Sequence, residues 1–452
     1  MKKAVKSCLA LVVILGILCV AGVGAMFVLK LCPPQGPWMM PPWCEGGMAA
    51  PEIPTNIPNI VATKAAAPFV PTPTPYVYVL PSDYQQTFSD PGWGQKPVLS
   101  SDFMIGNTFM DVYGNKQFNQ HLDSTIASMK DTGANWVIFD NYWTYTSLEP
   151  PVVEPFPNRF GFRDATADEI QTMVTKTHED NMKFALMMEL NWDAMANPSM
   201  SWDEYQKFWS DNQQFLAEKS ENVETNAAYW DSWFEAYTTF ALDQATTAEA
   251  SGVDMLVIGK QIDGAVAAGN IERWKALIAK VREVYHGPIS YAAYTNQYGS
   301  QASDFPYEDT DFIIIYYYNG ISEADEPTLE ELKASFENFN KEQFEPLSRK
   351  YGKPVIFLTP FQSRDQGARQ DWFEPSAPSP EVGQDLLVQS EMYEALFQSI
   401  QNKDWVAGVW TWGYWWQDDF PTDTSYEKSS SVRNKPAMWI IQKWADGIGA
   451  NP

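Results

Sequence analysis

Eight short apolar runs recur along residues 82–452, and longer amphipathic stretches separate most of them. Such runs, rich in Val, Ile and aromatic residues, are typical of the buried strands of a parallel sheet. Their alternation with helices over this length predicts a (β/α)8 barrel, the TIM-barrel architecture of the α/β class. The predicted strands are residues 103–106, 135–141, 183–190, 253–259, 288–294, 311–318, 353–359 and 405–412.

Amphipathic stretches between these strands predict the helices of the barrel. A doubly wound open sheet is the alternative for the same alternation of elements. Neither GxGxxG nor GxxxxGK[ST] follows any predicted strand, so the nucleotide that such sheets often bind has no support. The predicted helices are residues 167–180, 230–250, 270–285, 328–351, 384–402 and 435–444.

The N-terminal region differs in character from the barrel. Lys2, Lys3 and Lys6 precede an apolar stretch, residues 7–29, that is long enough to cross a bilayer as a helix. Basic residues on its N-terminal side predict a cytoplasmic N-terminus and an extracytoplasmic C-terminal part. Small residues at 23–25 keep a cleaved signal peptide, and hence secretion, open as an alternative. The apolar stretch continues past that site, which favours a retained membrane anchor.

Residues 31–81 are rich in Pro and Ala and include PTPTP, which predicts an extended linker. The expected organisation is therefore an anchor or signal segment over residues 1–30, a linker over 31–81 and the barrel over 82–452. All four Cys residues precede residue 45, so we expect neither a disulfide nor a Cys-based metal site in the barrel. A disulfide between Cys32 and Cys44 outside the cell remains open.

Charge and composition restrict the partner. The net charge of −26 argues against nucleic acid and anionic membrane surfaces, which are bound through Lys and Arg. The three His residues are dispersed along the chain, so no metal centre and no cofactor is expected. The 19 Trp and 21 Tyr include rings that fill the core and rings available to stack on sugars, which favours a poly- or oligosaccharide partner. The oligomeric state is not predicted.

Polar and aromatic residues recur where the predicted strands end. In a (β/α)8 barrel the carboxyl ends of the strands form the catalytic face. Rings, amides and carboxylates that converge there from several strands are typical of a polysaccharide cleft. The candidate sugar-binding residues are Asp140, Trp143, Glu189, Trp192, Tyr291, Tyr294, Asn296, Tyr317, Trp410 and Trp412.

Several segments resemble glycoside hydrolase family 113, TIM-barrel enzymes known chiefly as β-mannanases. The most specific is NIERWKALIAKVREVYHGPISYAAY, residues 270–294, which follows the IGKQ run and precedes DFIIIYYY. The similarity extends over about residues 101–444, through WFEAYTTFALDQATTAEASGVD at 233–254 and KPVIFLTPFQS at 353–363.

The resemblance implies a retaining mechanism with two glutamates, a general acid/base just after strand four and a nucleophile at the end of strand seven. Such a mechanism needs two carboxylates roughly 5 Å apart. The first position is Gln261, whose amide has no proton to lend at neutral pH. The second falls on Thr359, or on Leu358 in the alternative register, and neither replaces a carboxylate nucleophile.

Other acids are candidates for a rebuilt pair. Asp263 lies two residues after Gln261, and Asp365 lies in the loop after strand seven. Glu189, Asp418 and Asp419 lie at the ends of neighbouring strands. A pair such as Glu189 or Asp263 facing Asp365 or Asp418 would suit an inverting arrangement, whose carboxylates stand roughly 6.5 to 9.5 Å apart.

Three hypotheses follow. The first is a membrane-anchored, glycosidase-like barrel that binds carbohydrate without the family's catalytic pair. The second is an active glycoside hydrolase, similar to a β-mannanase or endo-acting on another glycan, that uses relocated carboxylates. The third is a protein-interaction domain in which the barrel serves only as a stable body.

Overall fold

The structure of the chain is a computed structural model that describes residues 97–109, 118–156, 163–197, 199–260, 262–295, 305–317, 320–369, 383–415 and 428–449. The predicted anchor and linker, residues 1–81, lie outside these ranges. Within the described ranges, no helix combines the length and the apolar composition needed to cross a bilayer.

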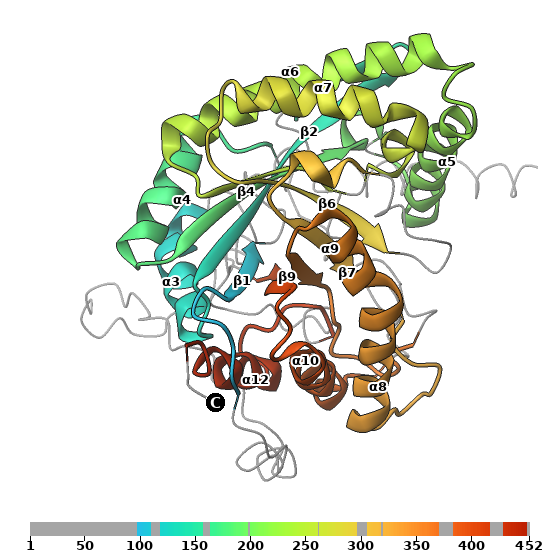
Figure 1. The fold of residues 1–452 in the computed structure, drawn as a ribbon. Coiled ribbons are helices and arrows are strands. Elements are labelled where there is room, and N and C mark those ends of the chain that lie inside the picture. Colours follow the sequence, from blue (N-terminus) through green and yellow to red (C-terminus); the bar gives the residue numbers. More distant parts are fainter. Residues whose placement is uncertain are drawn as a thin grey trace, which may run out of the picture.

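Eight parallel strands form a closed barrel (Figure 1). They follow the order β1, β9, β8, β7, β6, β5, β4, β2, and pairing of β1 with β2 closes the ring. The short strand β3 extends β2 as an antiparallel hairpin. The barrel prediction is thus confirmed, and the open sheet is wrong. The strands are β1 (Met104–Phe109), β2 (Trp136–Leu148), β3 (Pro151–Pro155), β4 (Lys183–Asn191), β5 (Met255–Lys260), β6 (Ile289–Thr295), β7 (Ile313–Tyr317), β8 (Val355–Thr359) and β9 (Val406–Tyr414).

Helices surround the barrel, and α10 packs between α8 and α12 on one side of it (Figure 1). Each predicted helix is present, but the stretch 328–351 is divided by a π-helical turn, Asn340–Phe344. The α-helices are α3 (Phe118–Asp131), α4 (Ala167–Glu179), α5 (Trp202–Glu221), α6 (Ala227–Ser251), α7 (Ile271–Arg282), α8 (Leu329–Phe339), α9 (Glu345–Tyr351), α10 (Leu386–Ile400) and α12 (Pro436–Ala445).

Sequence signals fix several helix ends. Capping boxes, in which a Ser or Thr hydroxyl and a Glu three residues later satisfy each other's backbone N–H groups, begin α4, α5 and α8. Helices α6 and α9 end at Gly252 and Gly352, whose positive φ angles of 73° and 64° favour glycine.

The barrel interior contains its own apolar core, separate from the larger core between strands and helices. Trp136, Ile138 and Trp410 belong to this interior core, and the centroids of the Trp136 and Trp410 rings lie 6.0 Å apart. Gly106 makes room for Trp410, because a Cβ atom there would lie 2.4 Å from the Trp410 ring. The interior is thus closed by side chains, and only the carboxyl ends of the strands remain for a site.

Candidate functional site

Three charged side chains meet inside the carboxyl end of the barrel: Asp140 on β2, Glu189 on β4 and Lys260 on β5. Alternation along β2 explains the direction of Asp140, because Trp136 and Ile138 face the interior core and the strand period is two. Glu189 continues the inward series of Ala185 and Met187 on β4 in the same way.

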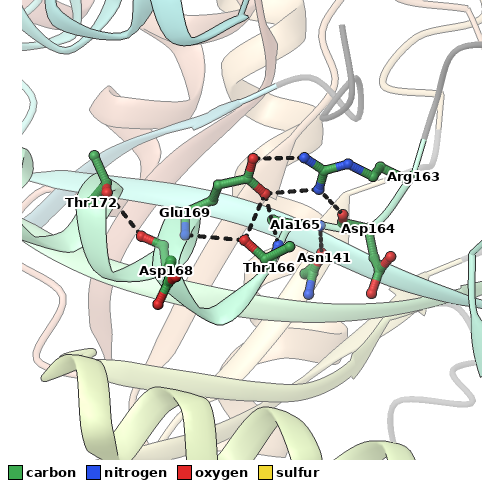
Figure 2. Close-up of polar contacts among 8 residues, drawn as sticks. All are labelled: Asn141, Arg163, Asp164, Ala165, Thr166, Asp168, Glu169 and Thr172. Atoms are coloured by element: carbon green, nitrogen blue, oxygen red, sulfur yellow. Dashed lines mark hydrogen bonds and ion pairs between the residues drawn. The ribbon is translucent and has the colours of Figure 1, made fainter. Parts of the chain in front are cut away.

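The neighbour of Asp140 anchors the end of β2 on its outer side. Asn141 donates from Nδ2 to Gln244 Oε1 on α6 at 2.9 Å, and its Oδ1 accepts from the Ala165 backbone N–H at 2.8 Å. Figure 2 shows Asn141 beside the start of α4, where the Arg163 guanidinium forms a bidentate ion pair with Glu169 at 2.8 and 2.6 Å. These contacts hold Asn141 outward, and Asp140 therefore faces inward.

A β-bulge directs Lys260 into the barrel. Val257 pairs with Ser290 and Lys260 with Ala292, so three steps along β5 match two along β6. Ile258 and Gly259 consequently both face the helix layer, where a Cβ atom on Gly259 would lie 2.9 Å from the Tyr291 ring. Bulges are common beside active sites because they redirect the next side chain.

Lys260 bridges the two acids. Its Nζ lies 2.5 Å from Asp140 Oδ2 and 2.5 Å from Glu189 Oε2. The Asp140 and Lys260 side chains are 1% exposed, whereas Glu189 is 16% exposed. Nζ also lies 5.3 Å from the Trp412 ring centroid, within cation–π range, and Trp412 packs edge-on against Tyr316. We call Asp140, Glu189, Lys260, Tyr316 and Trp412 the lysine cluster.

Burial shapes the protonation of the lysine cluster. It raises the pKa of the Asp140 carboxyl from 3.8 to about 7, against the opposing attraction of Lys260. Burial alone would lower the pKa of Lys260, but the Asp140 and Glu189 carboxylates outweigh it and raise that pKa above its ordinary value. Lys260 therefore stays charged, while Asp140 changes its charge near neutral pH.

The end of β8, the seventh strand of the barrel, contains both positions considered for the nucleophile, Leu358 and Thr359. Leu358 belongs to the interior core, and it pairs with Tyr316 and Trp410 on the neighbouring strands. Thr359 faces the helix layer instead, since its Oγ1 lies within hydrogen-bond distance of Trp410 O, at 3.0 Å, and of Tyr393 OH on α10, at 3.2 Å. Leu358 is thus the inward residue, and Thr359 does not face the barrel interior.

Most of the predicted aromatic sugar contacts pack in the cores. Trp143 stacks on Phe240 of α6, with ring centroids 4.9 Å apart, and Tyr291 stacks on Phe305 at 4.3 Å. Among the predicted binding residues whose side chains are described, Trp412 is the one aromatic residue that is only half-buried. The buried rings are those of Trp143, Trp192, Tyr291, Tyr317 and Trp410, each 7% exposed or less.

Several predicted residues are not placed in the lysine cluster. The exposed Asp365 carboxylate accepts from the Gly383 backbone N–H at 2.8 Å, so it joins two loop segments. Gln261, Asn296, Asp418 and Asp419 lie outside the described residues, as do the side chains of Asp263 and Tyr294.

The sequence analysis did not predict Lys260 as a site residue, although the sequence contains a signal for it. An otherwise apolar strand that ends in Lys, in a chain with acids at the ends of two neighbouring strands, indicates a buried ion pair. As for metals, the described part of the chain contains no group of three or more His, Cys, Asp or Glu side chains suited to hold an ion.

Comparison with known proteins identifies relatives of this barrel. The family model described as Glycoside Hydrolase Family 113 matches residues 108–435. The fold resembles a β-mannanase of that family from Alicyclobacillus acidocaldarius in complex with ManMIm, at 18% identity, covering 78% of this chain and 98% of that one, with TM-score 0.56. It also resembles a GH113 β-1,4-mannanase at 19% identity, covering 78% and 99%, with TM-score 0.53. No curated protein matches the sequence.

Proposed function

Because the chain belongs to glycoside hydrolase family 113, we propose that its barrel binds a poly- or oligosaccharide at the carboxyl ends of the strands without the family's retaining acid and nucleophile pair. The main support is the end of β8, where the inward residue is Leu358 and the strand VIFLT carries no carboxylate. A retaining mechanism needs a nucleophile that attacks the anomeric carbon, and leucine cannot supply one.

Lys260 supports the same proposal from the other side of the barrel. It directly precedes Gln261, the position of the acid/base, and its buried ammonium holds two carboxylates. The site therefore suits binding of hydroxyl groups by Glu189 and stacking on Trp412 better than proton donation.

The second candidate function is hydrolysis by relocated carboxylates. Asp140 Oδ2 and Glu189 Oε2 both lie 2.5 Å from Lys260 Nζ, so these two oxygens are no more than 5.0 Å apart. A pKa of about 7 for Asp140 is suited to a group that gives and takes protons at neutral pH. Asp263 and Asp365 remain the other candidates for this role.

An assay for new reducing ends separates the two functions. The full-length protein, purified in mild detergent, is incubated with mannan, glucan and xylan, and binding is followed by tryptophan fluorescence. We expect a change in fluorescence without release of reducing ends. Release that disappears in Asp140→Asn, Asp263→Asn or Asp365→Asn, but persists in the exposed control Glu235→Gln, would establish hydrolysis instead. Absence of binding to every glycan would favour the protein-interaction domain.

We also propose that the barrel lies outside the cell on a single-pass N-terminal anchor. The support is the apolar stretch at residues 7–29, preceded by three Lys residues. Protease treatment of intact cells should digest the barrel domain, and alkaline washing should leave the protein in the membrane fraction. Recovery of the protein in the culture medium would instead indicate a cleaved signal peptide.

A further inference from the structure

The lysine cluster presents one charged group toward solvent. Glu189 is 16% exposed, whereas the Asp140 and Lys260 side chains are 1% exposed. Glu189 Oε2 is buried against Lys260, so the exposed part of this side chain is on the side away from Oε2. A ligand that enters the carboxyl end of the barrel would therefore meet the Glu189 carboxylate and the half-buried Trp412 ring.

Lys260 cannot serve an anionic ligand as well. Its Nζ is already within 2.5 Å of two carboxylate oxygens and lies over the Trp412 ring. The cluster thus contains two acids for one cation, within a chain whose net charge is −26. A carboxylate brought beside Glu189 would meet like charge in a partly desolvated site, where repulsion is stronger than in water.

Asp140 lies behind Glu189 and does not reach a ligand, because its side chain is 1% exposed and its Oδ1 is buried. When protonated, Asp140 can donate to the Glu189 carboxylate, and this hydrogen bond helps to raise the pKa of Asp140. Glu189 is therefore the acid of the cluster that a ligand contacts, and an uncharged hydroxyl group can donate to it.

We propose that Glu189, held in place by Lys260, selects uncharged sugars over uronates in this barrel. Glu189 is the specificity-determining residue, and Lys260 is its positioning residue. This inference rests on the proposed carbohydrate binding and adds to it the class of sugar that is accepted and the residue responsible for the selection.

The test compares two ligands of one skeleton, β-1,4-linked mannohexaose and its hexamannuronate counterpart, which differ in the carboxylate at C6. Isothermal titration of the full-length protein should show at least about tenfold tighter binding of mannohexaose. Glu189→Gln should weaken mannohexaose binding about fivefold, through loss of a charge-assisted hydrogen bond, and should reduce the preference at least about tenfold. The exposed matched control Glu235→Gln should behave as wild type.

Lys260→Met tests the positioning role. This substitution should weaken mannohexaose binding. Lys260→Arg, which keeps the cation, should retain much of the wild-type affinity. If Glu189→Gln does not fold, Glu189→Asp decides, because it keeps the charge and moves the carboxylate. That variant should retain the preference and bind mannohexaose more weakly.

An unchanged preference in folded Glu189→Gln, or wild-type affinity of Glu189→Asp for mannohexaose, would overturn the inference and leave the proposed function standing. Tighter binding of hexamannuronate by the wild type would do the same. Binding of neither hexasaccharide would also overturn it, and the mannan, glucan and xylan assay would then decide separately whether the barrel binds carbohydrate.

Discussion

Replacing Asp140 with Asn should change how the stability of the barrel depends on pH. Asn has nearly the shape of Asp, but it cannot ionise, so the substitution removes one titration from a buried site. The folded protein raises the pKa of Asp140 from 3.8 to about 7. At about 1.4 kcal/mol per pKa unit, this rise corresponds to about 4 kcal/mol between the two protonation states.

The sign follows from the direction of the shift. Because the folded pKa is raised, the stabilisation by protonated Asp140 is fully present below pH 3.8 and is lost as the pH rises through about 7. Relative to Asp140→Asn, the wild type should therefore lose about 3 kcal/mol of unfolding free energy between pH 4.5 and pH 8.

Urea denaturation of both proteins across this pH range measures the difference directly. Glu235→Gln, on the exposed face of α6, serves as the control and should follow the wild type in parallel. A difference between wild type and Asp140→Asn that is constant with pH would refute the raised pKa. A difference that grows in favour of the wild type as the pH rises would show that Asp140 is instead stabilised as a carboxylate by Lys260.

Three further substitutions test other contacts. Lys260→Met should reduce the unfolding free energy in urea by about 3 to 5 kcal/mol at pH 8 and by less at pH 5, because the acids it leaves can then be neutral. Gly106→Ala should cost about 1 to 3 kcal/mol, since its Cβ would overlap Trp410, and thermal unfolding monitored by circular dichroism would show this as a lower Tm. Glu394→Leu should cost about 1 to 3 kcal/mol in urea denaturation by leaving the buried Trp444 Nε1 donor without its acceptor at 2.8 Å, whereas Glu394→Gln, which keeps an acceptor, should cost less.

The strands could be predicted because a barrel buries them on both faces. Each then appears as a nearly continuous apolar run, and all eight runs coincide with strands of the structure. Helix α5 gave no such signal, since it is mostly exposed and its apolar residues are few, and it was not predicted. The hairpin strand β3 was also missed, because it is short and pairs with a neighbour close in sequence.

The directions of the side chains at the strand ends could not be predicted with the same success. Adjacent aromatic residues such as Tyr316 and Tyr317 look alike in sequence, yet the first lies in the interior core and the second in the outer core. A period of two settles such a choice only if the register is known and uninterrupted. At Lys260 it is interrupted by the bulge, which the sequence signals only by Gly259.

The extra residue in β5 also makes the chemistry of this barrel depend on chain length at one point. Removal of Gly259 would restore simple alternation, and the ammonium would move by one position along the strand. In an evolving lineage, a deletion of one codon there would keep the lysine inward, because it would then directly follow the outward Ile258, but would shift its ammonium along the strand relative to Asp140 and Glu189. Comparison of related sequences in this segment therefore requires an alignment that counts the spacing between the strand and the loop, as well as the identity of each residue.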